Sequence, residues 1–194
     1  STSKDIWGQT FEGTMRGLPV THVIATHLHP DHIGCAGWLT RQFDVDLWMT
    51  REEYMLARLL VADTGKPAPE EGVRFYAAAG FSEAALQEYR ERFGFFGRLV
   101  SRLPESYVRL HENDRLALGD HRWQVLIGRG HSPEHACLFC EDSNLLIAGD
   151  LLVRAALSLS RQARIPPMIV GLTVVKFVTD GAQPPPLAFV MYAQ

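Results

Sequence analysis

Thr-His-Leu-His-Pro-Asp-His-Ile-Gly-Cys, residues 26–35, is the segment around which the rest of the chain is arranged. It follows an apolar run, residues 20–25, that predicts a buried strand, so its polar side chains fall in a loop at a strand end. Four of them can bind a metal: His27, His29, Asp31 and His32. In an extended chain the first two point the same way, and the last two turn toward a second point nearby. Imidazole and carboxylate ligands suit Zn²⁺, Fe or Mn²⁺.

Two later segments carry the partners that such a site needs, which argues against a polar loop that is His-rich by chance. They are Gly-His-Ser-Pro-Glu-His at residues 130–135 and Ala-Gly-Asp at residues 148–150. With the first segment, they resemble the H-x-H-x-D-H, G-H-[ST]-P-x-H and G-D motifs of the metallo-β-lactamase superfamily. The resemblance runs from about residue 18 to residue 152, and no motif is matched beyond that point.

The resemblance implies a site with two metal ions. His27, His29 and His131 would hold the first ion, Asp31 and His32 the second, and Asp150 would bridge them. Zn²⁺ is the expected metal, with Fe or Mn as alternatives. Asp31 is also the candidate catalytic residue, because it could orient a metal-bound hydroxide and accept its proton.

The expected fold is α/β, a metallo-β-lactamase-like αββα sandwich with a helical insert at about residues 51–106. Segments of period-2 alternation and capped helices predict the α/β class directly, and the αββα architecture is what the resemblance implies. Residues 1–152 should form the domain, opening with a short helix at about residues 5–11. The strand hairpin that normally precedes the first motif in the family has no counterpart, so we expect an incomplete sandwich and a fragment of a longer protein.

Local patterns predict most elements of that domain. Residues 34–43 should be helical and residues 45–49 a strand, and Thr50-x-x-Glu53 has the pattern of a capping box that opens the next helix. Ser82 should cap a helix in the insert. From residue 107 the period-2 pattern returns, with strands near residues 107–110, 116–118 and 123–127 and a hairpin over residues 136–148.

The insert is rich in aromatic residues. Eight of the fifteen Phe and Tyr residues lie between Tyr54 and Phe96. They could wall a substrate pocket as a lid, or they could bury the insert against the sandwich. The sequence leaves both interpretations open.

The remaining histidines and cysteines favour structural roles. Cys137 and Cys140 fall on opposite sides of an expected strand, so core packing is favoured over a metal or redox pair. Cys35 is interpreted as a packing residue rather than a reactive thiol. His135 lies in the second motif, where support of the loop is at least as plausible as contact with substrate.

Composition excludes several classes of partner. A net charge of −3 without a basic block gives nothing to attract nucleic acid, and no signal peptide or membrane span is visible. Three cysteines without a disulfide framework favour the cytoplasm. The expected partner is a small-molecule substrate, and the oligomeric state is not predicted.

The tail, residues 153–194, changes in character. Asp180 is its one carboxylate, and it has no histidine, although the family takes a further metal ligand from its second half. Either the C-terminus has diverged, or the tail is translated out of the native frame. We favour the second explanation.

These features predict a metal-dependent hydrolase that uses a metal-bound hydroxide on a thioester, ester or lactone. Within the superfamily, the motifs look most like the glyoxalase II-type thioester hydrolases. Two alternatives stay open. One is a truncated fragment that binds metal weakly or is inactive, and the other is a mononuclear iron enzyme similar to the persulfide dioxygenases.

Overall fold

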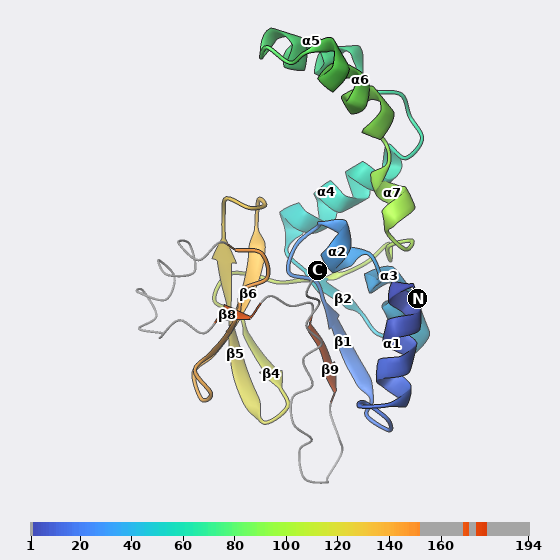
Figure 1. Cartoon of the computed structure of the whole chain (residues 1–194). Helices are drawn as coiled ribbons and strands as arrows, with labels where there is room; N and C mark the ends of the chain where they lie inside the picture. Colours follow the sequence, from blue (N-terminus) through green and yellow to red (C-terminus); the bar gives the residue numbers. More distant parts are fainter. Residues whose placement is uncertain (1, 152–168, 171–173, 178–194) are drawn as a thin grey trace.

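A computed structural model describes residues 2–151, 169–170 and 174–177 of the chain (Figure 1). The first half supplies most of the helices: α1 (Ser3–Glu12), α2 (Pro30–Ile33), α3 (Ala36–Phe43), α4 (Arg51–Ala62), α5 (Glu70–Ala78), α6 (Glu83–Arg92) and α7 (Phe96–Leu99). The strands are β1 (Val20–Ile24), β2 (Leu47–Met49), β3 (Val108–Arg109), β4 (Arg115–Leu118), β5 (His121–Gly128), β6 (His135–Cys140), β7 (Leu145–Ile147), β8 (Ile169–Val170) and β9 (Val174–Phe177).

The described strands form two sheets. The first has the order β3-β2-β1-β9, in which β1, β2 and β3 are parallel and β9 is antiparallel to β1. The second has the order β4-β5-β6-β7-β8 and is antiparallel except for the β7–β8 pair. The α/β class predicted from the sequence is therefore confirmed, and residues 107–150 form strands as expected.

Two buried layers hold the sandwich together. Side chains of both sheets meet in one layer, which includes Ile24, Leu110, Trp123 and Leu138. A second layer lies between the first sheet and the helices, and it includes Trp7 of α1, Leu39 of α3, Tyr54 of α4 and Val23 of β1. Cys140 belongs to the inter-sheet layer and Cys137 to a third cluster, so the two thiols do face opposite sides.

Strand β6 is enclosed on both faces, because all six of its residues are buried. It pairs with β5 along its whole length, from Gly128 opposite His135 to Trp123 opposite Cys140. A turn at residues 141–144 joins it to β7, which confirms the predicted hairpin. The paired strands β5 and β6 therefore flank the loop that carries His131.

The predicted capping box at the start of α4 is wrong. Thr50 is the N-cap residue, but its side chain accepts no hydrogen bond from the helix. Its hydroxyl instead donates to the carbonyl oxygen of Glu134 at 2.8 Å, and Glu53 is turned into the protein interior. The first turn of α4 thus bonds to a distant loop rather than to itself. By contrast, the predicted cap at Ser82 is confirmed, because its hydroxyl accepts from Ala85 N at 3.3 Å.

Helices α5 and α6 form an arm that stands beyond α4 and α7, away from the two sheets (Figure 1). Tyr76 packs on Phe81 and Tyr89 within the arm, at ring-centroid distances of 5.0 and 4.8 Å. Phe75 and Phe81 remain 68% and 48% exposed. The aromatics of the arm therefore do not bury it against the sandwich, and the interpretation as a lid stays a prediction.

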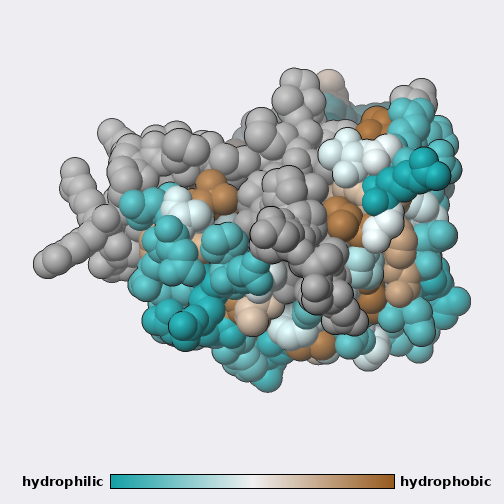
Figure 2. Space-filling view, turned by 90° about the horizontal axis from the view of Figure 1, so that it is seen from below, coloured by the Kyte–Doolittle hydropathy of each residue, from teal (hydrophilic) through white to brown (hydrophobic). Residues whose placement is uncertain are grey.

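One face of the molecule carries both polar and apolar side chains. Seen from below, hydrophilic side chains cover much of the described surface, and hydrophobic ones show in patches between them (Figure 2). Among the described residues, no helix is both long enough and apolar enough to cross a bilayer. Most of the tail, residues 153–194, lies outside the described residues. The two explanations for it, a divergent C-terminus and a shifted reading frame, therefore stay predictions.

Candidate metal centre

The first motif begins just after β1 and runs through α2. Strand β1 ends at Ile24, and the buried residues Ala25, Thr26 and His27 continue the chain beneath the site. His29 is the N-cap of α2, and Pro30 occupies the first turn, where its missing N–H costs no hydrogen bond. The single turn of α2 then redirects the chain, so Asp31 and His32 leave the line of the two preceding histidines.

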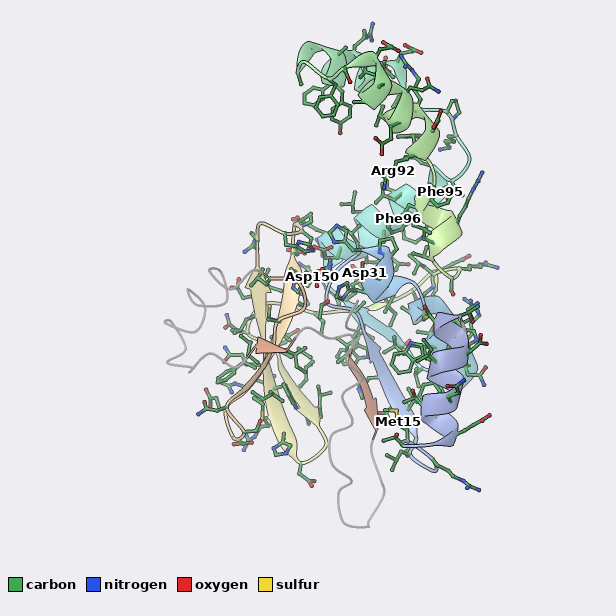
Figure 3. The ribbon with its side chains drawn as sticks, in the orientation of Figure 1. Met15, Asp31, Arg92, Phe95, Phe96 and Asp150 are labelled. Carbon is green, nitrogen blue, oxygen red and sulfur yellow. The ribbon has the colours of Figure 1, made fainter. Side chains whose placement is uncertain are left out.

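The other two motifs come from the second sheet. His131 lies in the loop between β5 and β6, and Asp150 follows β7. Gly149 has a φ of +52°, and a Cβ atom there would lie 2.5 Å from the ring of His135. Only glycine fits this turn, which brings Asp150 back toward the histidines. Asp31 and Asp150 lie side by side at one end of the sandwich (Figure 3).

Three histidine nitrogens form a nearly equilateral triangle. His27 Nε2 lies 3.0 Å from His29 Nδ1 and 3.1 Å from His131 Nε2. The third side, from His29 Nδ1 to His131 Nε2, is 2.9 Å. Neutral imidazole has one N–H donor and one acceptor nitrogen, so three nitrogens in a triangle cannot all be satisfied by one another. Nitrogens bound tetrahedrally at zinc distances would be roughly 3.3 Å apart, so the triangle fits one small cation.

Asp150 connects this triangle to a second donor group. Its Oδ2 atom lies 3.5 Å from His131 Nε2 and 4.0 Å from His27 Nε2. Its Oδ1 atom lies 3.1 Å from His32 Nε2, which is itself 3.4 Å from Asp31 Oδ2. Two sets of potential metal ligands therefore share Asp150: His27, His29 and His131 on one side, and Asp31 and His32 on the other. The structure brings together all six side chains singled out from the sequence.

Burial keeps the inner histidines neutral. The pKa of His27 is lowered to about 2, first by burial and then by the neighbouring His32, His135, His29 and His131. Burial also lowers the pKa of His135 to about 4, with a further contribution from His131. A neutral imidazole offers the lone pair that metal binding requires, so His27 is ready to bind a cation at neutral pH.

Two side chains support this arrangement from below. Thr26 Oγ1 lies 3.0 Å from Nδ1 of His27, on the ring edge opposite the triangle. His135 is fully buried, accepts a hydrogen bond from Asp150 N at 3.2 Å and stacks on His27 at 4.5 Å. The interpretation of His135 as support for the loop is consistent with these contacts. No sequence pattern had indicated Thr26.

Glu53 is the residue of the site region that sequence reasoning misassigned. It is fully buried and accepts hydrogen bonds from Leu28 N at 3.0 Å and Glu134 N at 2.8 Å. The signal was visible as a glutamate inside an otherwise amphipathic helix. The same glutamate also completes the local pattern of a capping box, which predicts a bond within the helix.

A two-sheet sandwich with joined His/Asp groups at one end is typical of metal-dependent hydrolases. A family model, the Metallo-beta-lactamase superfamily, matches residues 15–175, which extends past residue 152 where the motifs end. The chain belongs to this superfamily.

Individual relatives agree with that assignment. An uncharacterized protein of Aquifex aeolicus (strain VF5) is 30% identical over 142 residues, which are 73% of this chain and 54% of the relative. A solved beta-lactamase domain protein from Burkholderia ambifaria has a TM-score of 0.71 and 30% identity, covering 91% of this chain and 57% of that one. A metallo-beta-lactamase family protein from Thermus thermophilus has a TM-score of 0.56 and 24% identity, covering 79% and 48%. The chain thus spans about half the length of the relatives that it matches.

Proposed function

We propose that this protein holds two metal ions and hydrolyses a small-molecule thioester, ester or lactone. The observation that carries the proposal is the pair of donor groups joined by Asp150, whose two oxygens face His131 and His32 separately. A carboxylate in this position can bridge two cations. Zinc is the first candidate, because three imidazoles and one carboxylate make a tetrahedral set of ligands for it.

Each side chain then has a defined role. His27, His29 and His131 would hold the first cation, Asp31 and His32 the second, and Asp150 both. When bound, such cations supply a hydroxide nucleophile at neutral pH and polarise the carbonyl under attack. Asp31, with its side chain 54% exposed, is open to solvent and can orient the attacking water and take up its proton.

Thioesters are the substrate class that we favour. The motifs His-Leu-His-Pro-Asp-His and Gly-His-Ser-Pro-Glu-His resemble those of the glyoxalase II-type hydrolases. The chain spans about half the length of the relatives that it matches. Hydrolysis of a thioester by the whole protein is therefore proposed on the motifs alone.

The test combines metal analysis with a substrate panel of thioesters, lactones and β-lactams. We expect two equivalents of zinc and turnover of a thioester, with turnover lost in Asp31→Asn and kept in His111→Ala. His111 is a suitable control because it lies outside both donor groups and pairs with Asp114. Bound metal without any turnover would support the inactive-fragment alternative, and oxygen consumption with a persulfide would support the iron oxygenase.

A further inference from the structure

We infer that Glu53 is a positioning residue of the metal site, which holds the two histidine-bearing loops at a fixed distance from each other. This inference rests on the proposed metal site. It concerns a residue that donates no ligand to either metal group. Its basis is the geometry of one buried carboxylate.

The two oxygens of Glu53 serve two different loops. Oε2 accepts from the backbone N–H of Leu28, the residue between His27 and His29. Oε1 accepts from the backbone N–H of Glu134, which lies between His131 and His135. The sequence separations are 25 and 81 residues, so neither bond is part of a helix or a turn. One side chain thereby ties together both loops that carry the triangle of nitrogens.

A second set of bonds fixes α4 to the same loop. Glu134 Oε2 accepts from Glu52 N at 3.0 Å, and the Thr50 hydroxyl donates to Glu134 O at 2.8 Å. Glu134 therefore caps the helix that presents Glu53, and Glu53 in return accepts from the backbone of Glu134. Reciprocal bonds of this kind leave little freedom for Glu53 to turn away from the loops.

The chemistry explains why a carboxylate is needed. Ionised carboxylate is an acceptor at both oxygens, and bonds from N–H groups to it are stronger than those between neutral partners. Glutamine has the same shape but only one acceptor, so its NH₂ group would face one of the two N–H donors. Glu53→Gln therefore releases one loop without changing the volume of the side chain.

The loops stay joined at one further point in such a variant. Ala136 N donates to Thr26 O at 2.8 Å, next to His27 and His135. We therefore expect Glu53→Gln to fold, with its histidines less well ordered before metal binds. Residues that orient metal ligands typically contribute about 10- to 100-fold in metal affinity.

The experiment measures zinc affinity by competition with a chromophoric chelator, so no substrate is involved. We expect Glu53→Gln to bind zinc at least about tenfold more weakly than the unchanged protein. Glu52→Gln is the matched control, because it removes the same charge from an exposed neighbour on the same helix and should bind as the unchanged protein does. Equal affinity of Glu53→Gln and the unchanged protein would overturn the inference and leave the proposed function standing. No zinc binding by the unchanged protein would overturn both.

Circular dichroism and thermal unfolding of the metal-free variants complete the test. A purely structural role of Glu53 would lower the unfolding temperature and leave the zinc affinity unchanged. If Glu53→Gln does not fold, Thr50→Val replaces it, since it removes only the hydroxyl bond to Glu134. A loss of about threefold or more in zinc affinity would then support the positioning role of Glu53, and unchanged affinity would overturn it.

Discussion

At the scale of single residues, the triangle formed by His27, His29 and His131 is the feature with the clearest chemical meaning. Its nitrogens lie 2.9 to 3.1 Å apart. Three neutral imidazole nitrogens at these distances cannot all be satisfied by hydrogen bonds to one another. The sequence separation of 102 residues between His29 and His131 excludes a local cause. A metal site needs ligand atoms from distant parts of the chain to lie close together in this way.

Alanine at His29 or at His131 should abolish tight zinc binding, because either change leaves two imidazoles in the first donor group. The same change at His111, whose side chain is 54% exposed, should leave binding nearly intact. Isothermal titration with zinc measures all three variants. Equal losses in the three would indicate general unfolding rather than ligation.

The metal-free protein should lose stability as the pH falls below about 6.5. The pKa of His135 is lowered to about 4 and that of His27 to about 2, so the unfolded chain binds more protons than the folded one from about pH 6.5 downward. Each histidine then lowers the free energy of unfolding by about 1.4 kcal/mol per pH unit, until the pH reaches its folded pKa. Urea unfolding at pH 7.5 and 5.0 measures this difference.

A variant assigns that pH dependence to its source. His135→Gln removes one of the two histidines whose pKa is lowered by burial, so the decline between pH 7.5 and 5.0 should be less steep. A free energy of unfolding that is flat over this range in the unchanged protein would contradict the burial of neutral histidines.

At the scale of elements, the sequence predicted most of the fold because most elements are decided locally. The period-2 runs became β4, β5, β6 and β7, and the Ser82 cap formed as its pattern indicates. Thr50-x-x-Glu53 failed because its side chains bond to residues 84 and 81 positions away. A capping box and hydrogen bonds to a distant loop use the same residue types, and only the tertiary structure distinguishes them.

The same reasoning applies to the site. The six candidate ligands could be found because they lie in short motifs with characteristic spacing. Of their supports, His135 lies in a motif and was predicted to hold the loop, whereas Thr26 was not predicted and Glu53 was assigned to a local cap, because these two act through contacts that no spacing encodes. What a sequence motif predicts is a set of donors, and the positioning of those donors depends on the whole fold.

Gly94 lies at the base of the arm formed by α5 and α6. Gly94 has a φ of +69°, and a Cβ atom there would lie 2.5 Å from Asp63 O and 3.0 Å from Lys66 O. Gly65 N also donates to Gly94 O at 3.0 Å, which joins the two connecting segments. Phe95 and Phe96 follow directly, where the arm meets α7 (Figure 3).

Gly94→Ala should therefore separate the two segments and loosen the arm, with a cost of about 1–2 kcal/mol from the left-handed backbone alone. Amide hydrogen exchange should become faster in α5 and α6, while β5 and β6 keep their protection. Gly80→Ala is the control, because its φ of +89° is also positive but a Cβ there meets nothing within 4 Å. Equal effects of the two variants would show that backbone strain alone matters.

At the scale of the whole molecule, the two donor groups are unequal. The first has three imidazoles and Asp150, whereas the second, within the described residues, has Asp31, His32 and Asp150. Water must fill the remaining positions around a second cation, so its affinity should be lower.

Dialysis against a mild chelator should accordingly remove one ion well before the other. Activity, where present, should fall with the first loss and return when Zn²⁺ or Mn²⁺ is added. Metal content measured against dialysis time distinguishes the cases. If both ions leave together, a further residue must complete the second group.

The donor groups also join the two sheets, and this affects how the protein reaches its native state. His27 and His29 extend from the first sheet, and His131 and Asp150 from the second, and the sequence separation of His27 and His131 is 104 residues. Closing so long a loop costs conformational entropy, and contacts between such distant segments form slowly during folding. A cation can bind tightly only after both sheets have docked, so it should slow unfolding far more than it speeds refolding. A bound cation would therefore stabilise the native state once folding is complete, and it would contribute little to the rate of folding.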